Sequence, residues 1–264
     1  MDILIVCVNY NSYDALSDYL NTIYAAQKEC DGVNVEVKIA DNSTHEQKIE
    51  NPNRLNIEVF KFNNLGYFGA AQTIINGLQN VEKYKYIIIS NVDLLIPEDF
   101  FSKLKTQKYD NDVAWIAPKL LSLSENKNRN PKIISRLSKK RVSILQLFYR
   151  FPFLNKIYET FFYSRRQSAK QDYLSGKIYA GHGSFIILSN VFFANYKTIN
   201  YPIFMFGEEI YLAELIRVKN LHVFYDTMLT VNDKDHISTR EMKKDFYYKC
   251  NYDAITFIKK TYYE

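Results

Sequence analysis

The chain has 264 residues, of which 47% are hydrophobic and 16% aromatic, and its formal net charge is +5. This length suits one large domain with a sizeable core. The scarcity of glycine (8) and proline (6) excludes collagen-like and Pro/Gly-rich disordered classes. Three widely separated cysteines, Cys7, Cys30 and Cys250, show neither a disulfide framework nor a zinc spacing, which favours a reducing, cytoplasmic setting. No apolar run approaches the roughly 20 residues that a membrane-spanning helix needs.

The first half alternates apolar runs of strand length with segments of helical periodicity. In chain order we expect a strand at 3–8, a helix at 13–28, strands at 33–40 and 56–62, a helix at 68–80, a strand at 84–90 and a helix that Pro97 opens. The strands carry Ile and Val on both faces. They therefore indicate an α/β fold with a doubly wound, mostly parallel central sheet and helices on both faces.

The second half has a different composition. Between Lys127 and Lys170 there are 12 Lys/Arg residues and a single acid, Glu159. Beyond this basic and aromatic segment we expect a strand at 178–189, a helix at 207–220, strands at 221–226 and 228–231, and a final helix at 241–262.

Polar side chains follow each predicted strand of the first half. Asn9, Asp41, Asn64 and Asp93 all lie just past strand ends. Ligands of doubly wound sheets bind beyond the carboxyl ends of the strands. This shared position predicts one binding site at that edge.

Two of these residues are carboxylates with alternative interpretations. Asp41, in "IADNST", suits a hydrogen bond from a nucleobase N–H or a ribose hydroxyl, but it also suits an Asx turn or a helix N-cap. Asp93, in "SNVDLL", suits a Mg²⁺ or Mn²⁺ ion on a diphosphate, but it also suits a cap of the helix near Pro97.

The stretch "NNLGYFGAAQ" places Gly66 and Gly69 before a helix, where backbone can approach a ligand closely or form a plain loop. It lacks the GK[ST] ending of a P-loop and the third glycine of a dinucleotide fingerprint. In "MFGEEIYLAEL", Glu208 and Glu209 open a helix. They suit a general base in a partly buried site, or merely acids favoured by the helix dipole.

Two further segments carry alternatives. His236 in "DKDHISTR" is either a structural histidine or a ligand of metal or phosphate, with Arg240 on the phosphates. The segment 139–166 is either a basic helical pair with aromatics in the core or a contact with an anionic membrane surface. It carries no recognisable nucleic-acid motif.

The order of these motifs resembles that of the family 2 glycosyltransferases with a GT-A fold. The series is "VNYNS", "ADNS", "NNLGYFGAAQ", "SNVDLLI", "GSFIILS", "FGEEIYL" and "DHIS". It is most similar to the rhamnosyltransferase-like branch that builds bacterial capsule and O-antigen polysaccharides. The resemblance covers roughly 2–125 and 178–240 and leaves out the basic segment.

The resemblance implies inverting transfer from a UDP- or dTDP-sugar to a hydroxyl of a lipid-linked surface oligosaccharide at the inner face of the cytoplasmic membrane. It implies one domain over 1–264, in which 1–125 binds the nucleotide sugar, 126–177 is an insertion, and 178–264 binds the acceptor and carries the catalytic acids.

The resemblance also assigns roles to individual residues. Asp41 would hold the base and ribose, and Asp93 and His236 a divalent Mg²⁺ or Mn²⁺ ion. Glu209, or else Glu208, would be the base. The other nucleotide-sugar-binding residues would be Val8, Asn9, Asn11, Asn64, Gly66, Asn91 and Arg240.

Three positions depart from the family pattern. Asn91 precedes Asp93 where a first aspartate is usual, Glu209 replaces the aspartate of the acidic pair, and Tyr211 replaces a following aspartate. A non-catalytic binding or scaffold protein of a polysaccharide assembly complex therefore stays open as an alternative. A sugar nucleotidyltransferase is another, although its Gly-rich, Arg/Lys-ended loop is missing after the first strand.

Overall fold

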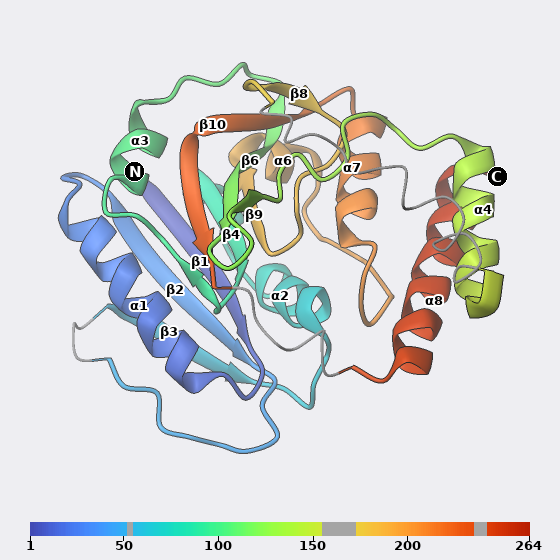
Figure 1. Cartoon of the computed structure of the whole chain (residues 1–264). Coiled ribbons are helices and arrows are strands. Elements are labelled where there is room, and N and C mark those ends of the chain that lie inside the picture. Colours follow the sequence, from blue (N-terminus) through green and yellow to red (C-terminus); the bar gives the residue numbers. More distant parts are fainter. Residues whose placement is uncertain (52–54, 155–172, 235–241) are drawn as a thin grey trace.

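A ten-stranded mixed sheet forms the centre of the protein, as seen in a computed structural model that describes residues 1–51, 55–154, 173–234 and 242–264 (Figure 1). The strand order is β3-β2-β1-β4-β9-β6-β10-β5, with β7 beside β6 and β8 beside β10. Strands β3, β2, β1 and β4 are mutually parallel, β10 is parallel to β6, and β9 runs antiparallel to both of its neighbours.

The strands are β1 (Asp2–Asn9), β2 (Asn34–Asp41), β3 (Asn56–Lys61), β4 (Tyr86–Asn91), β5 (Leu94–Leu95), β6 (Val113–Ser122), β7 (Lys127–Asn128), β8 (Gly176–Ile178), β9 (Phe185–Ser189) and β10 (His222–Asp233). The α-helices are α1 (Tyr13–Lys28), α2 (Tyr67–Asn76), α3 (Phe100–Thr106), α4 (Lys139–Arg150), α6 (Asn190–Asn195), α7 (Glu208–Val218) and α8 (Lys244–Tyr262), and η1 (Val81–Lys83) is a 3₁₀ turn.

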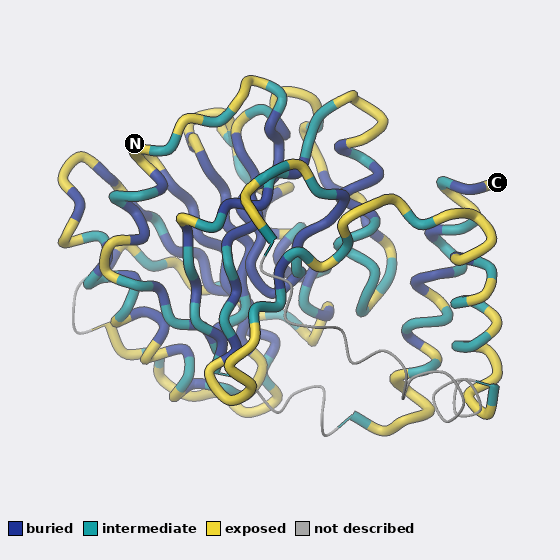
Figure 2. Tube along the Cα trace, turned by 45° about the horizontal axis from the view of Figure 1, so that its top comes forward, coloured by how far each residue is buried: buried dark blue, intermediate teal, exposed yellow. Residues whose placement is uncertain are grey.

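Helices cover both faces of the sheet, as the apolar runs predicted. Ile3 and Ile5 pack into a cluster with the apolar residues of α1 and α3, whereas Leu4 and Val6 pack on the other face with α2, α6 and α7. The central strands are therefore buried along their length, while the outer sides of the helices are exposed (Figure 2). Burial on both faces accounts for strands without polar alternation.

Helices α4 and α8 lie side by side, outside the helices that contact the sheet (Figure 1). Val142 is the buried residue of α4, and Gln146 donates a hydrogen bond to Thr256 of α8 (2.9 Å). Residues 139–150 of the basic segment thus form a helix that packs on α8. Residues 155–172, the rest of that segment, lie outside the described residues.

Several predicted boundaries were wrong. α2 ends at Asn76 because Gly77 closes it, its N–H donating to the Thr73 carbonyl (3.2 Å). The helix expected at Pro97 begins at Phe100, whose N–H donates to the Pro97 carbonyl (3.0 Å).

Two strand predictions in the second half were also wrong. The strand predicted at 178–189 is two strands, β8 and β9, separated by a loop at 179–184. Conversely, 221–226 and 228–231 belong to one strand, β10, with an irregularity between Asp226 and Thr230.

Candidate active site

Asp41 forms the centre of a polar cluster at the carboxyl ends of β1 and β2. The parallel register sets Asn9 directly opposite Asp41. The buried Asp41 carboxylate accepts hydrogen bonds from Asn9 Nδ2 (3.1 Å), Tyr13 Oη (2.8 Å), and Ser43 N and Oγ (3.2 and 2.6 Å). These donors fix its position. Neighbouring Val8 pairs with Ala40 and Asn91 in the sheet.

Asn11 fastens the loop after β1 to the loop after β2. Its backbone adopts a left-handed conformation (φ 53°), its N–H donates to Ser43 Oγ (2.8 Å), and its Oδ1 accepts from the Thr44 N–H (3.0 Å). An asparagine tolerates this backbone better than most residues. The two loops therefore form one rim beside Asp41.

Gly66, which precedes α2, lies against the segment before α7. Its φ of 75° favours glycine, and an added Cβ would lie 2.0 Å from the Phe204 carbonyl oxygen. Asn64 Oδ1 accepts from the Gly66 N–H (3.2 Å), and Asn42 Nδ2 donates to the Gly66 carbonyl (3.0 Å). The glycine is required for this close approach, which the sequence left open.

Asp93 lies between β4 and β5. Its carbonyl accepts from the Lys234 N–H (3.0 Å) at the end of β10. Because β5 separates it from α3, it does not cap that helix. The pKa of Tyr67 is raised well above its usual value by burial first, then by carboxylates that include Glu208, Glu209 and Asp93. Asp93 and the two glutamates are therefore within electrostatic reach of one phenol.

Glu208 and Glu209 begin α7 and lean against the loop between β8 and β9. A Cβ on Gly183 would lie 2.8 Å from Glu208 Oε1 and 3.1 Å from Glu209 Oε1. Burial, then the neighbouring Glu209, raises the pKa of Glu208 to about 8. The entry to the helix is tight, because Phe206 and Gly207 both have positive φ (66° and 82°). A carboxyl group with a raised pKa, such as that of Glu208, is typical of a site that transfers protons.

Tyr67, the first residue of α2, connects that helix to the loop between β8 and β9. This contact could not be predicted from the sequence. Tyr67 follows Gly66, and its hydroxyl donates to the Gly183 carbonyl (2.7 Å). On the far side of that loop, the Asn91 N–H donates to the Ser184 carbonyl (2.9 Å). The loop is thus held between the end of β4 and the glutamates.

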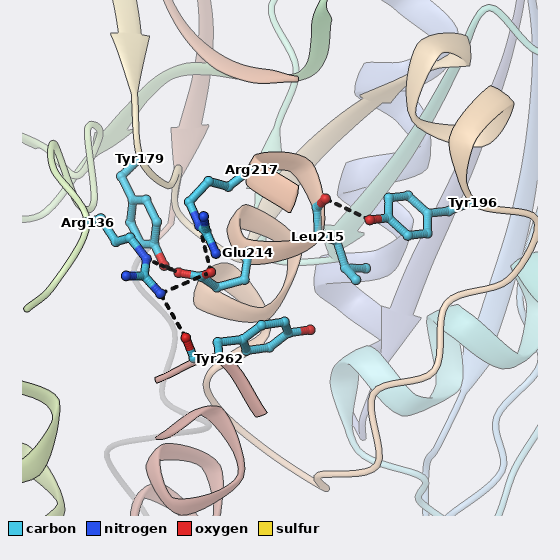
Figure 3. Close-up of polar contacts among 7 residues, drawn as sticks. All are labelled: Arg136, Tyr179, Tyr196, Glu214, Leu215, Arg217 and Tyr262. Carbon is cyan, nitrogen blue, oxygen red and sulfur yellow. Dashed lines mark hydrogen bonds and ion pairs between the residues drawn. The ribbon is translucent and has the colours of Figure 1, made fainter. Parts of the chain in front are cut away.

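The buried Glu214, also missed from the sequence, anchors α7 (Figure 3). It accepts from Arg136 Nε (2.6 Å), Tyr179 Oη (2.7 Å) and Arg217 Nε (2.8 Å). Burial opposes ionisation, but these three donors outweigh it and lower the pKa of Glu214. On the opposite side of α7, Tyr196 Oη donates to the Leu215 carbonyl (2.8 Å).

Two predicted site residues, His236 and Arg240, lie outside the described residues. Within the described ranges, no three His, Cys, Asp or Glu side chains gather as a metal site. Tyr211 is buried, and its hydroxyl accepts from the Asn200 N–H (3.1 Å). It is a structural residue.

Comparison with known proteins gives similarity in structure but none in sequence. No family model matches the chain, and no curated protein does. S. aureus TarS 1-349 in complex with UDP-GlcNAc has 11% identity and a TM-score of 0.54, over 98% of this chain and 65% of that one. GalNAc-T7 with UDP, GalNAc and Mn²⁺ has 10% identity and a TM-score of 0.61, over 99% of this chain and 49% of that one.

The fold is the GT-A fold of glycosyltransferases. This confirms the fold class expected from the sequence. The chain spans less than two thirds of the length of each of these structures. At such low identities the GT-A similarity is one of fold, and the chemistry has to be argued from the residues of the site.

Proposed function

We propose that this protein is an inverting glycosyltransferase that moves a sugar from a UDP- or dTDP-sugar to a hydroxyl of a lipid-linked bacterial surface oligosaccharide. The observation that carries the proposal is the arrangement of carboxylates around one loop. Asp93 lies two residues beyond β4, and Glu208 and Glu209 lie at the start of α7 against the loop between β8 and β9, which Asn91 and Tyr67 hold by hydrogen bonds. A sugar bound here would have its leaving group on one side and an acceptor base on the other.

The Asp41 cluster is the proposed nucleoside site. Its carboxylate lies at the edge where doubly wound sheets bind ligands. The donors around it leave its orientation fixed, so it would receive the base and ribose without rearrangement. Asn9, Asn11 and Gly66 shape the rim of this site. GT-A structures bound to UDP-GlcNAc and to UDP support a nucleotide-sugar donor.

Asp93 is the proposed protein ligand of a divalent cation. A hard cation takes carboxylate oxygens together with substrate phosphates, and Asp93 offers the carboxylate, with His236 expected nearby from the sequence. The similar GalNAc-T7 structure contains Mn²⁺. Such an ion would neutralise charge on the departing diphosphate.

Glu209 is the proposed general base, with Glu208 as the alternative. An acceptor hydroxyl is a weak nucleophile, so a carboxylate has to take its proton as the new bond forms. Glu208, whose pKa is raised to about 8, retains its proton near neutral pH, which leaves Glu209 as the proposed base. Attack from the face opposite the diphosphate inverts the anomeric centre.

An apolar pocket on the segment that leads into α7 supports an acceptor with an apolar part. It has a volume of about 490 Å³ and is lined by the 202–205 segment and α8, including Phe204 and Phe257. No helix in the described ranges is long and apolar enough to cross a membrane. On α4, Ile144 and Leu147 are exposed near Lys139, Lys140 and Arg141, and we propose that this surface contacts anionic lipid at the inner face of the cytoplasmic membrane.

Release of the nucleotide (UDP, dTDP, GDP or CMP) from a panel of UDP-, dTDP-, GDP- and CMP-sugars, with and without Mn²⁺, tests the donor. Turnover of a UDP- or dTDP-sugar supports the proposal. Tight binding of these donors without turnover would instead support the scaffold alternative. Co-sedimentation of the K139A/K140A/R141A variant with anionic vesicles tests the membrane contact, and binding equal to wild type contradicts it.

A further inference from the structure

The segment 129–132, which no part of the proposed reaction uses, lies along the loop between β8 and β9. Ile133 forms an antiparallel bridge with Ala180, and their backbones exchange hydrogen bonds (3.0 and 2.9 Å). The His182 N–H donates to Asn130 Oδ1 (2.7 Å), and Asn130 Nδ2 donates to the Pro118 carbonyl (2.8 Å). This geometry sets Lys132 alongside Gly181, next to His182.

His182 is oriented by its own loop. Its Nδ1 accepts the Ser184 N–H (3.2 Å), so the imidazole proton resides on Nε2, which is left to act as a donor. Burial first, then Lys132 and Arg129, lowers the pKa of His182 to about 3. The ring is therefore a neutral hydrogen-bond donor at physiological pH.

Lys132 and Arg129 supply positive charge on the same side. Lys132 is exposed and makes no ion pair with any other described residue. Its positive charge lowers the pKa of Glu208, against the larger effects of burial and of Glu209. Arg129 Nη1 forms an ion pair with Asp233 Oδ2 (2.7 Å), and Asp233 pairs with Leu94 in the sheet, next to Asp93. The two cations thus flank Asn130, which accepts the His182 N–H.

We infer that Lys132, His182 and Arg129 form a subsite for a phosphate group. Lysine binds phosphate as a point charge, and a neutral N–H beside it adds a directional hydrogen bond. The inference rests on the proposed function for its source of phosphate, which is either the diphosphate of the donor or a phosphate carried by the acceptor. The chemistry is the same in both cases.

Calorimetric titration of wild type, K132A and K127A tests the subsite. Lys127 is an exposed lysine of β7 in the same segment, so K127A controls for loss of net charge. Inorganic pyrophosphate is titrated in EDTA, so that the protein's own cations determine the affinity. K132A should bind it at least fivefold more weakly than wild type, and K127A should bind it equally well. H182A should weaken it in the same direction.

Two further ligands distinguish the sources. If the donor is the source, K132A weakens UDP but not uridine. If the acceptor is the source, UDP binds K132A normally, while glycerol 3-phosphate binds the UDP-saturated wild type and not the variant. Wild-type affinity of K132A for both pyrophosphate and glycerol 3-phosphate overturns the inference. Loss of pyrophosphate binding in a protein that turns over no nucleotide sugar would keep the subsite and reject the proposed function.

Discussion

Asp41 and the Glu208–Glu209 pair are acidic groups in opposite surroundings. Four donor groups converge on Asp41, supplied by the end of β1, by α1 and by the loop after β2. Glu208 instead faces burial and a second carboxylate, which raise its pKa to about 8. The first arrangement holds the Asp41 carboxylate in one orientation, as a site that only binds a ligand requires. The second keeps the proton of Glu208 in place near neutral pH, as a site that moves protons requires.

The largest expected effect is the loss of turnover on substitution of Glu209. E209Q should lower kcat about 10³-fold, because the acceptor hydroxyl loses its base, while UDP binding stays unchanged. Rates of sugar transfer and UDP titrations measure the two quantities. E125Q, at an exposed turn, is the matched control. A kcat within threefold of wild type excludes Glu209 as the base.

Substitution of Asp41 should instead affect donor binding and spare turnover. D41N removes a charged acceptor from a network of hydrogen bonds, each worth about 1.5–3 kcal/mol. UDP affinity should fall about tenfold or more, with kcat at saturating donor little changed. D14N on the exposed side of α1 controls for the charge. A fall in kcat with unchanged affinity would show that Asp41 acts in the chemistry instead.

Tyr67 connects the two regions, so its variant should affect one of them selectively. Y67F loses the hydrogen bond to the Gly183 carbonyl, worth about 1 kcal/mol. We expect kcat to fall about fivefold and UDP affinity to hold. Equal losses in both parameters would mean that Tyr67 contacts the nucleotide directly.

The smallest expected effect concerns stability against pH. Glu208 has a folded-state pKa near 8 against an ordinary value of 4.5, so the folded state holds this proton more tightly than the unfolded state. Its contribution to stability is lost as pH rises from about 4.5 to about 8. E208Q cannot ionise, so its Tm should gain on wild type by about 2–4 °C between pH 6 and pH 9. A constant difference across that range contradicts the raised pKa.

The sequence predicted those parts of the site that follow from strand ends. Asn9, Asp41 and Asp93 lie beyond buried apolar runs, and a parallel sheet brings such ends together whatever the loops contain. Strand β6 was not predicted, since Pro118 interrupts its apolar run. His182, Tyr67 and Glu214 were missed because each has a partner that lies far away in the chain, at 52, 116 and 78 residues respectively. Local periodicity carries no information about such contacts.

The Glu214 network connects helices α7 and α8 through Arg136. Arg136 binds Glu214 and also donates to the Tyr262 carbonyl near the end of α8 (3.0 Å). Two residues further on, Ser138 caps α4 by accepting the Arg141 N–H (3.2 Å). The Arg136 guanidinium thus contacts α7 and α8, and its residue lies just before the N-cap of α4. Loss of Arg136 would therefore remove a contact of α7 and a contact of α8 at once.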